Sequence, residues 1–140
     1  MKIGVPKEII SQEYRVSINP ETAKLLIESS HQLYIQKSAG DGSGYSDEDY
    51  KSLGCVIVDT ASEVFTKSDL IVKVKEPLNE EVEMMRDKML FTYLHLSSSK
   101  KLTEKLLECN VTSLAYETVV INNETPMLKP MSEIAGRLSL

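Results

Sequence analysis

Short apolar runs alternate along the chain with amphipathic segments, at the spacing expected for β-strands separated by α-helices. The runs are rich in branched side chains, as in strands that are buried on both faces of a parallel sheet. We expect six strands, at residues 2–5, 33–36, 55–58, 70–74, 90–94 and 111–116. This alternation predicts an α/β fold, a doubly wound, mostly parallel sheet with helices on both faces.

Capping signals predict where the helices begin. Asn19 followed by Pro20 is typical of a helix start, as are the capping-box pairs Ser46 with Asp49 and Thr60 with Glu63. Asn79 is expected to cap the next helix, and a last helix is expected from Ser132 onward. The expected inward-facing residues of the two helices after residue 79 are Val82, Met85 and Met89, and then Leu102, Leu106 and Leu107.

Two connections stand out by length or composition. Residues 7–18 exceed the usual connection of about two to six residues, so this segment is either functional or contains an added strand, for which residues 15–18 are the candidate. Residues 119–127 carry two adjacent asparagines at their centre, and this pattern predicts an exposed hairpin or excursion.

Polar side chains follow several of the predicted strands. They are Lys7 and Arg15 after the first strand, Lys75 and Glu76 after the fourth, His95 after the fifth and Glu117 after the sixth. In an open α/β sheet the ligand crevice lies beyond the carboxyl ends of the strands, so these groups are expected to converge on one edge.

The chemistry of this set suits a small anion with a polarisable carbonyl group. Arginine can clamp a carboxylate, lysine can polarise an oxygen, and histidine can exchange a proton near neutral pH. A 2-oxo or 2-amino acid has the matching groups. Each residue also has a structural explanation: Arg15 as a solvated loop residue, His95 as a hydrogen-bonded structural histidine, and Lys73 as a side chain that reaches water along the strand edge. The shared sheet edge favours the functional interpretation.

A glycine-rich loop at residues 38–44 invites comparison with nucleotide-binding loops. Its glycines, at 40, 42 and 44, are followed by Tyr45 where the dinucleotide fingerprint needs another glycine. A tight turn therefore explains this loop better than a phosphate site.

Composition narrows the class of protein. The 140 residues fit one domain, and the net charge of −5 without a basic block argues against a nucleic-acid partner. We also expect no membrane span, because no apolar run approaches about 20 residues. The amino terminus lacks the pattern of a signal or transit peptide, which predicts a cytoplasmic protein. Cys55 and Cys109 have no metal-ligand spacing and are expected to pack in the core, so no metal site is predicted.

Several segments together resemble one family. MKIGVPKE, EYRVSINP, GDGSGYSD, DLIVKVKEP, LFTYLHL, TSLAYETV and LKPMSEIAGRLS occur in the order found in the amino-terminal part of bacterial alanine dehydrogenase, across all 140 residues. The first domain of the proton-translocating nicotinamide nucleotide transhydrogenase is similar at its start. It lacks the paired lysines before KEP and the histidine of LHL, so the central stretch favours alanine dehydrogenase.

The resemblance implies an NAD-dependent enzyme that interconverts L-alanine with pyruvate and ammonia. It implies that Arg15 holds the substrate carboxylate, that Lys75 contacts a substrate oxygen and that His95 is the acid/base group. Met131 and Ser132 would face the nicotinamide and the substrate. The supporting residues would be Glu13 and Tyr93.

The resemblance also predicts the domain organisation. Residues 1–130 would be the first segment of a Rossmann-like substrate-binding domain, incomplete here, and residues 131–140 the start of an inter-domain helix. The NAD-binding domain is expected to be absent, so the chain alone is predicted to be inactive. Residues Met131, Ile134 and Leu138 would form an exposed apolar strip, and a homo-oligomer is expected because the family is commonly hexameric. The alternatives are a stand-alone 2-oxo-acid-binding module, a subunit that completes a separately encoded NAD-binding partner, or a relative of the transhydrogenase α-subunit.

Overall fold

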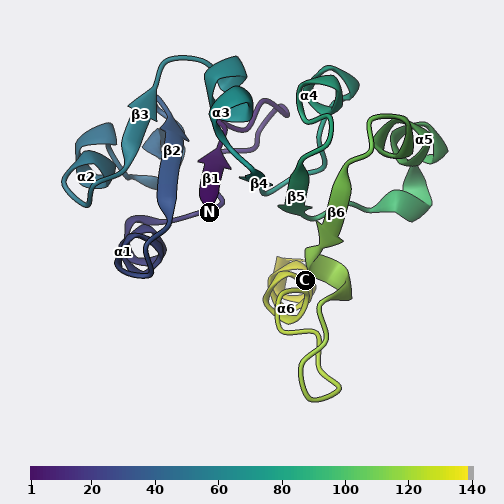
Figure 1. The fold of residues 1–140 in the computed structure, drawn as a ribbon. Helices are drawn as coiled ribbons and strands as arrows, with labels where there is room; N and C mark the ends of the chain where they lie inside the picture. Colours follow the sequence, from purple (N-terminus) through teal and green to yellow (C-terminus); the bar gives the residue numbers. More distant parts are fainter. Residues whose placement is uncertain (139–140) are drawn as a thin grey trace.

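A single six-stranded parallel sheet organises the molecule (Figure 1). The structure, a computed structural model, describes residues 1–138. The strands are β1 (Lys2–Val5), β2 (Gln32–Gln36), β3 (Val56–Val58), β4 (Leu70–Val72), β5 (Met89–Thr92) and β6 (Thr112–Ala115). Their order is β3-β2-β1-β4-β5-β6, and every pairing is parallel. This confirms the predicted doubly wound α/β fold, in which the chain changes direction across the sheet at β1.

Helices cover both faces of the sheet (Figure 1). The helices are α1 (Pro20–Glu28), α2 (Asp47–Lys51), α3 (Ala61–Lys67), α4 (Asn79–Met84), α5 (Lys100–Glu108) and α6 (Lys129–Leu138), and the 3₁₀ turns are η1 (Asp41–Ser43), η2 (Leu96–Ser98) and η3 (Tyr116–Thr118). Helices α3, α4 and α5 lie on one side, while α1 and α6 lie on the other.

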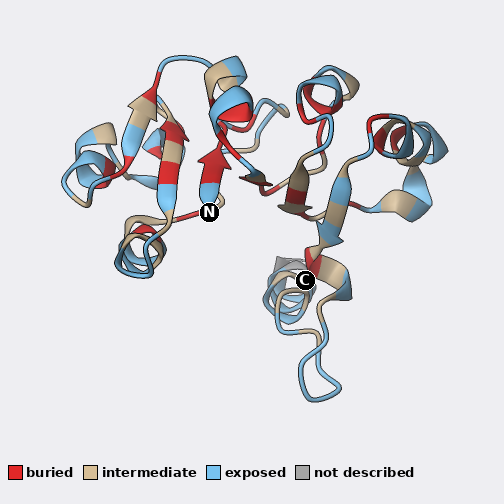
Figure 2. Cartoon of the chain, in the orientation of Figure 1, coloured by how far each residue is buried: buried red, intermediate tan, exposed pale blue. Residues whose placement is uncertain are grey.

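Two apolar clusters fill the space between the sheet and these layers. One contains Val5 and Ile35 with residues of α1 and α2, and the other contains Ile71 and Leu90 with residues of α3, α4 and α5. Figure 2 shows this burial concentrated on the strands and on the sheet-facing sides of the helices. Because strand side chains alternate between faces, β4 and β5 contribute to both clusters, through Val72 and Phe91 on one face and Ile71 and Leu90 on the other. Among the described residues no helix is both long and apolar enough to cross a bilayer.

The helix starts follow local capping chemistry. Asn19 accepts the backbone N–H of Thr22 at 2.8 Å, and both predicted capping boxes, at Ser46 and at Thr60, are present. The prediction for α4 was wrong by one residue. Leu78 is the N-cap, because its N–H is bound by the carboxylate of Glu81 at 2.9 Å, the reciprocal half of a capping box.

Two other local predictions were wrong, and one of the two alternatives for residues 7–18 does not hold, each for a tertiary reason. Met89 belongs to β5 because α4 ends before it, and Leu107 is 76% exposed because only Leu102 and Leu106 share the face that α5 turns to the core. Residues 15–18 are irregular and not a strand. Strand β1, which they follow, already has β2 and β4 on its two edges, so no free edge lies beside it.

The carboxyl-terminal part contains the predicted excursion. Ile121 and Glu124 exchange backbone hydrogen bonds of 2.9 and 3.0 Å around Asn122 and Asn123, which both have positive φ angles, as a tight hairpin turn requires. Helix α6 then starts earlier than Ser132, at Lys129. On α6 Met131 is half-buried and Ile134 is exposed, while the side chain of Leu138 lies outside the described part of the chain.

Candidate functional site

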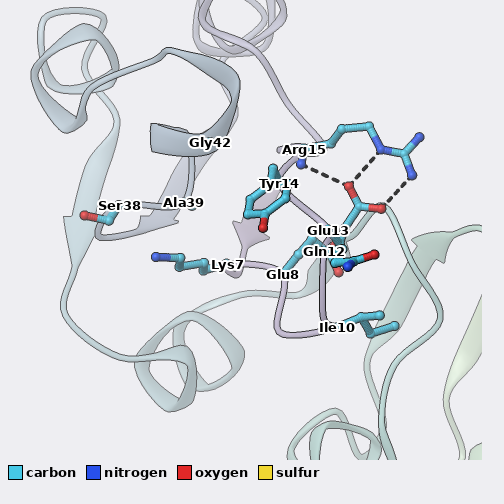
Figure 3. A pocket seen from close by; sticks show the side chains of 10 residues that line it. All are labelled: Lys7, Glu8, Ile10, Gln12, Glu13, Tyr14, Arg15, Ser38, Ala39 and Gly42. Carbon is cyan, nitrogen blue, oxygen red and sulfur yellow. Dashed lines mark hydrogen bonds and ion pairs between the residues drawn. The ribbon is translucent and has the colours of Figure 1, made fainter.

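The loop after β1 holds Arg15 in a fixed orientation through Glu13 (Figure 3). The guanidinium donates Nε to Glu13 Oε1 at 2.8 Å and Nη2 to Glu13 Oε2 at 2.6 Å, and the backbone N–H of Arg15 donates to the same carboxylate at 3.0 Å. The hydrogen bond to Arg15 lowers the pKa of Glu13, and that bond raises the pKa of Arg15 in turn. Glu13, predicted as a supporting residue, therefore orients a cation that is 44% exposed.

Arg15 borders a cavity of about 390 Å³ between this loop, the end of β4 and the start of α6. We call it the Arg15 cavity; it is lined by Arg15, Val16, Ser17, Asn19, Ser43, Tyr45, Val74, Tyr93, Tyr116, Met127 and Met131. Guanidinium Nη1 lies 3.2 Å from the Met131 sulfur, across 116 residues of sequence. The structure thus brings together three of the predicted site residues, Arg15, Tyr93 and Met131, in one mixed polar and aromatic cavity.

His95 lies beside this cavity and does not line it. Its ring stacks on Tyr93, with centroids 6.2 Å apart and planes at 20°, and its Nδ1 is 3.6 Å from Glu76 Oε2. The residue has a left-handed backbone, φ 47°, held by Glu117, which accepts the N–H of His95 at 2.7 Å and that of Leu94 at 3.1 Å. Burial alone would raise the pKa of Glu117, but these backbone hydrogen bonds outweigh it and the pKa is lowered.

Lys75 and Ser132 do not line the Arg15 cavity either. Lys75 is half-buried after β4, its carbonyl accepts the Thr92 hydroxyl at 2.9 Å, and its positive charge contributes to the lowered pKa of Glu13. It is therefore near the Glu13–Arg15 pair. Ser132 is exposed and lines a separate surface cavity beside the 119–127 excursion.

A second cavity, of about 250 Å³, lies on the other side of the Arg15 loop, against the glycine-rich segment (Figure 3). A Cβ at Gly42 would lie 2.5 Å from the Tyr14 carbonyl oxygen, and one at Gly40 would lie 2.7 Å from that of Tyr45. The glycines therefore admit the protein's own backbone, and Gly44 adopts φ 82°. The tight-turn interpretation is confirmed.

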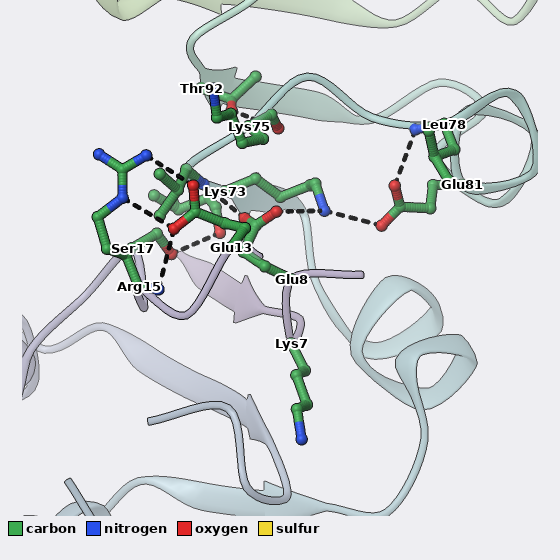
Figure 4. A network of polar contacts seen from close by, with 12 residues as sticks. Lys7, Glu8, Glu13, Arg15, Ser17, Lys73, Lys75, Leu78, Glu81 and Thr92 are labelled. Carbon is green, nitrogen blue, oxygen red and sulfur yellow. Dashed lines mark hydrogen bonds and ion pairs between the residues drawn. The ribbon is translucent and has the colours of Figure 1, made fainter. Parts of the chain in front are cut away.

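A buried charged group lies behind the site (Figure 4). The Lys73 side chain is 1% exposed, and its Nζ lies 2.8 Å from Glu81 Oε1 and 3.3 Å from Glu8 Oε2. The expectation that Lys73 reaches water was therefore wrong. Sequence reasoning missed both carboxylates, although a lysine inside an apolar run requires buried acidic partners, because an unpaired buried charge is strongly destabilising.

The Glu13–Arg15 pair should make stability depend on pH. Because the pKa of Glu13 is lower in the folded chain than in the unfolded one, its stabilisation is present above about pH 4.5 and is lost as pH falls through the lowered folded pKa. We expect Glu13→Gln to reduce the free energy of unfolding at pH 7 by no more than about 1 kcal/mol, since Arg15 is partly solvated. In urea titrations at pH 7 and pH 3 the difference from the wild type should shrink in acid; a difference that grows in acid would contradict this assignment.

Comparison with known proteins shows similarity to alanine dehydrogenases over nearly the whole chain. The chain is 48% identical to alanine dehydrogenase of Methanococcus maripaludis, covering 100% of this chain and 38% of that protein. It is also 48% identical to the Mycolicibacterium smegmatis enzyme of the same name, again with 38% of the relative covered. A solved L-alanine dehydrogenase structure superimposes with a TM-score of 0.93 at 47% identity, over 99% of this chain and 39% of that one.

A transhydrogenase from Sinorhizobium meliloti shares the fold, with a TM-score of 0.79 at 24% identity over 84% of this chain and 35% of that one. The chain thus spans about two fifths of the length of the relatives that it matches. The model of the alanine dehydrogenase/PNT N-terminal domain matches residues 4–135, and the chain belongs to this family.

Proposed function

We propose that this chain is the substrate-binding part of an NAD-dependent alanine dehydrogenase, and that it holds pyruvate or L-alanine in the Arg15 cavity. The observation that carries this proposal is the fixed guanidinium at the cavity wall. Glu13 occupies Nε and Nη2 of Arg15, whereas Nη1 faces a thioether, which is a weak acceptor that a carboxylate oxygen can replace. The similarity to alanine dehydrogenases over nearly the whole chain supports the choice of substrate.

The other predicted residues take complementary roles in this proposal. Lys75, near the Glu13–Arg15 pair, would donate to the carbonyl or carboxylate oxygen of the substrate. His95, stacked on Tyr93 at the side of the cavity, would exchange a proton with the reacting group. Glu117 and Tyr93 would hold the histidine from its backbone and from its ring face.

NAD, when bound, would accept the hydride that leaves the amino acid. Met131 and Ser132, at the start of α6, would face it in the assembled enzyme. In the glycine-rich loop, a Cβ at Gly40 or Gly42 would meet the protein's own backbone, so these glycines serve the turn. A homo-oligomeric enzyme is the assembly that we expect, and apolar side chains exposed near the carboxyl-terminal end, at Val120, Ile121 and Ile134, are compatible with contacts to further protein.

Calorimetric titration with pyruvate tests the proposal. We expect Arg15→Ala to weaken binding by about tenfold or more, because a hydrogen bond to a charged group is lost. Arg15→Lys should bind with intermediate affinity, because it keeps the charge and loses the fixed fork. Lys24→Ala is the matched control, since it removes a cation from an exposed ion pair on α1. A wild-type chain that does not bind pyruvate, or an Arg15→Ala variant that binds as well as the wild type, would overturn the assignment.

Acetate separates the carboxylate contact from the carbonyl contact. It has the carboxylate of pyruvate but no 2-oxo group, so Arg15→Ala should weaken both ligands. If Lys75 contacts the carbonyl oxygen, Lys75→Ala should weaken pyruvate alone. Equal effects of Lys75→Ala on the two ligands would instead assign Lys75 to the carboxylate.

A further inference from the structure

Glu8 is a buried carboxylate to which the proposed reaction assigns no task. It lies three residues after the end of β1, and its side chain is 3% exposed. Oε1 accepts the backbone N–H of Val74 at 2.7 Å, and Oε2 lies 3.3 Å from the ammonium of Lys73 (Figure 4). A carboxylate in such a position is retained only where its partners offset the loss of hydration.

The two segments that Glu8 joins are the two that carry the proposed substrate contacts. On one side, Glu8 begins the loop that continues to Glu13 and Arg15, and it lines the same 250 Å³ cavity as those residues. On the other side, it accepts the backbone N–H of Val74, the residue that directly precedes Lys75. The Glu8 side chain therefore links the loop that carries Arg15 to the strand end that carries Lys75.

Neighbouring contacts limit movement of the same strand end. The Ser17 hydroxyl donates to the Val72 carbonyl at 2.8 Å, and the Thr92 hydroxyl donates to the Lys75 carbonyl at 2.9 Å. Both are neutral hydrogen bonds, whereas the bond to Glu8 has an ionisable acceptor next to a buried ammonium. Charge-assisted bonds are shorter and stronger, so the Glu8 contact is expected to dominate the position of the Lys73–Val74 peptide, directly before Lys75.

We propose that Glu8 is a positioning residue that sets the placement of Lys75 relative to Arg15, with Lys73 as the counter-charge that keeps Glu8 in the acceptor form. The role of the positioned pair rests on the function proposed above. In this arrangement Glu81 is the second carboxylate at the Lys73 ammonium and also caps α4, so the ammonium is held in place from both sides.

The electrostatics agree with this role. Burial raises the pKa of Glu8, while the Lys73 charge and the backbone N–H groups of Val74 and Lys75 act against that rise. Removal of Lys73 would therefore favour the protonated form of Glu8, which is a weaker acceptor for the Val74 N–H.

Two substitutions at Glu8 distinguish the effect of its hydrogen-bond acceptor from the effect of its negative charge. Glu8→Gln keeps an oxygen that can accept the Val74 N–H but carries no charge, whereas Glu8→Ala removes both. Leu106→Ala is the control for stability alone, because Leu106 is buried in the cluster on the opposite side of the sheet from the Arg15 loop. Each variant of the 140-residue chain is compared by ¹H–¹⁵N correlation spectra without ligand, by pyruvate titration and by urea unfolding.

We expect Glu8→Ala to shift the amide signals of Val74 and Lys75 and those of the Arg15 loop, and to weaken pyruvate binding by about tenfold. Glu8→Gln should cause smaller amide shifts and a smaller loss of pyruvate affinity than Glu8→Ala, which would be a partial rescue. Leu106→Ala should lower the free energy of unfolding and leave the site amides and the affinity unchanged.

The ligand-free spectra keep this test separate from that of the proposed function. If the wild type does not bind pyruvate, the proposed function fails, and the amide shifts still decide whether Glu8 positions the two segments. Unchanged site amides in Glu8→Ala would overturn the proposal, as would a loss of affinity that Leu106→Ala reproduces in proportion to its loss of stability.

Discussion

Replacing Lys73 with methionine should destabilise the fold by about 3–5 kcal/mol, the usual effect of removing one partner from a buried ion pair. The side chain is 1% exposed, and its removal would leave the carboxylates of Glu8 and Glu81 without their cation inside the protein. Methionine has a similar shape, so the change isolates the charge. Urea unfolding monitored by circular dichroism measures the loss.

A second ion pair provides the matched control for this prediction. Lys105 Nζ lies 2.8 Å from Glu83, the same distance as Lys73 to Glu81, but Glu83 is 63% exposed. Lys105→Met should therefore change the free energy of unfolding by no more than about 1 kcal/mol. Neutralising the partners as well, in Lys73→Met with Glu8→Gln and Glu81→Gln, should recover part of the stability. Equal losses for the two lysines would show that burial does not set the strength of the Lys73 contacts.

Gly4 in the central strand should tolerate an added methyl group poorly. A Cβ there would lie 2.4 Å from Ser68 Oγ and 2.7 Å from Val64 Cγ1. Val64 lies within α3 and Ser68 is its C-cap, and this helix packs directly on β1. Gly4→Ala must push the helix away from the strand, and such overpacking is expected to lower the free energy of unfolding by about 1–3 kcal/mol.

A double-mutant cycle measures this contact. Ser68→Gly removes the two Ser68 side-chain atoms that a Cβ on Gly4 would meet, so the double variant Gly4→Ala with Ser68→Gly should lose less than the sum of the single changes. Gly136→Ala on α6 is the control, because a Cβ there meets no atom within 4 Å and alanine favours a helix. Additive losses at Gly4 and Ser68 would show that the strand and the helix have room to separate.

Local patterns were sufficient for most of the fold. Alternating apolar runs, the capping boxes at Ser46 and Thr60 and the paired asparagines at 122 and 123 each act within a few residues, so the elements can be predicted without knowledge of their neighbours. The position of Leu107 could not be predicted this way. Helix geometry allows it to follow Leu106 toward the core, and only the packing of α5 decides which of the two faces inward.

For the site, the sequence by itself placed Arg15, Lys75 and His95 after strands that end at one edge of a parallel sheet, because strand direction and connection are encoded locally. Tertiary structure alone decided which other residues complete the site. It brought Arg15 to Met131, placed Tyr93 between the Arg15 cavity and His95, and buried Lys73 between Glu8 and Glu81. These partners are far apart along the chain or hidden within ordinary polar segments. Their pairing depends on which side chains the folded sheet and helices exclude from water, and no local pattern carries that information.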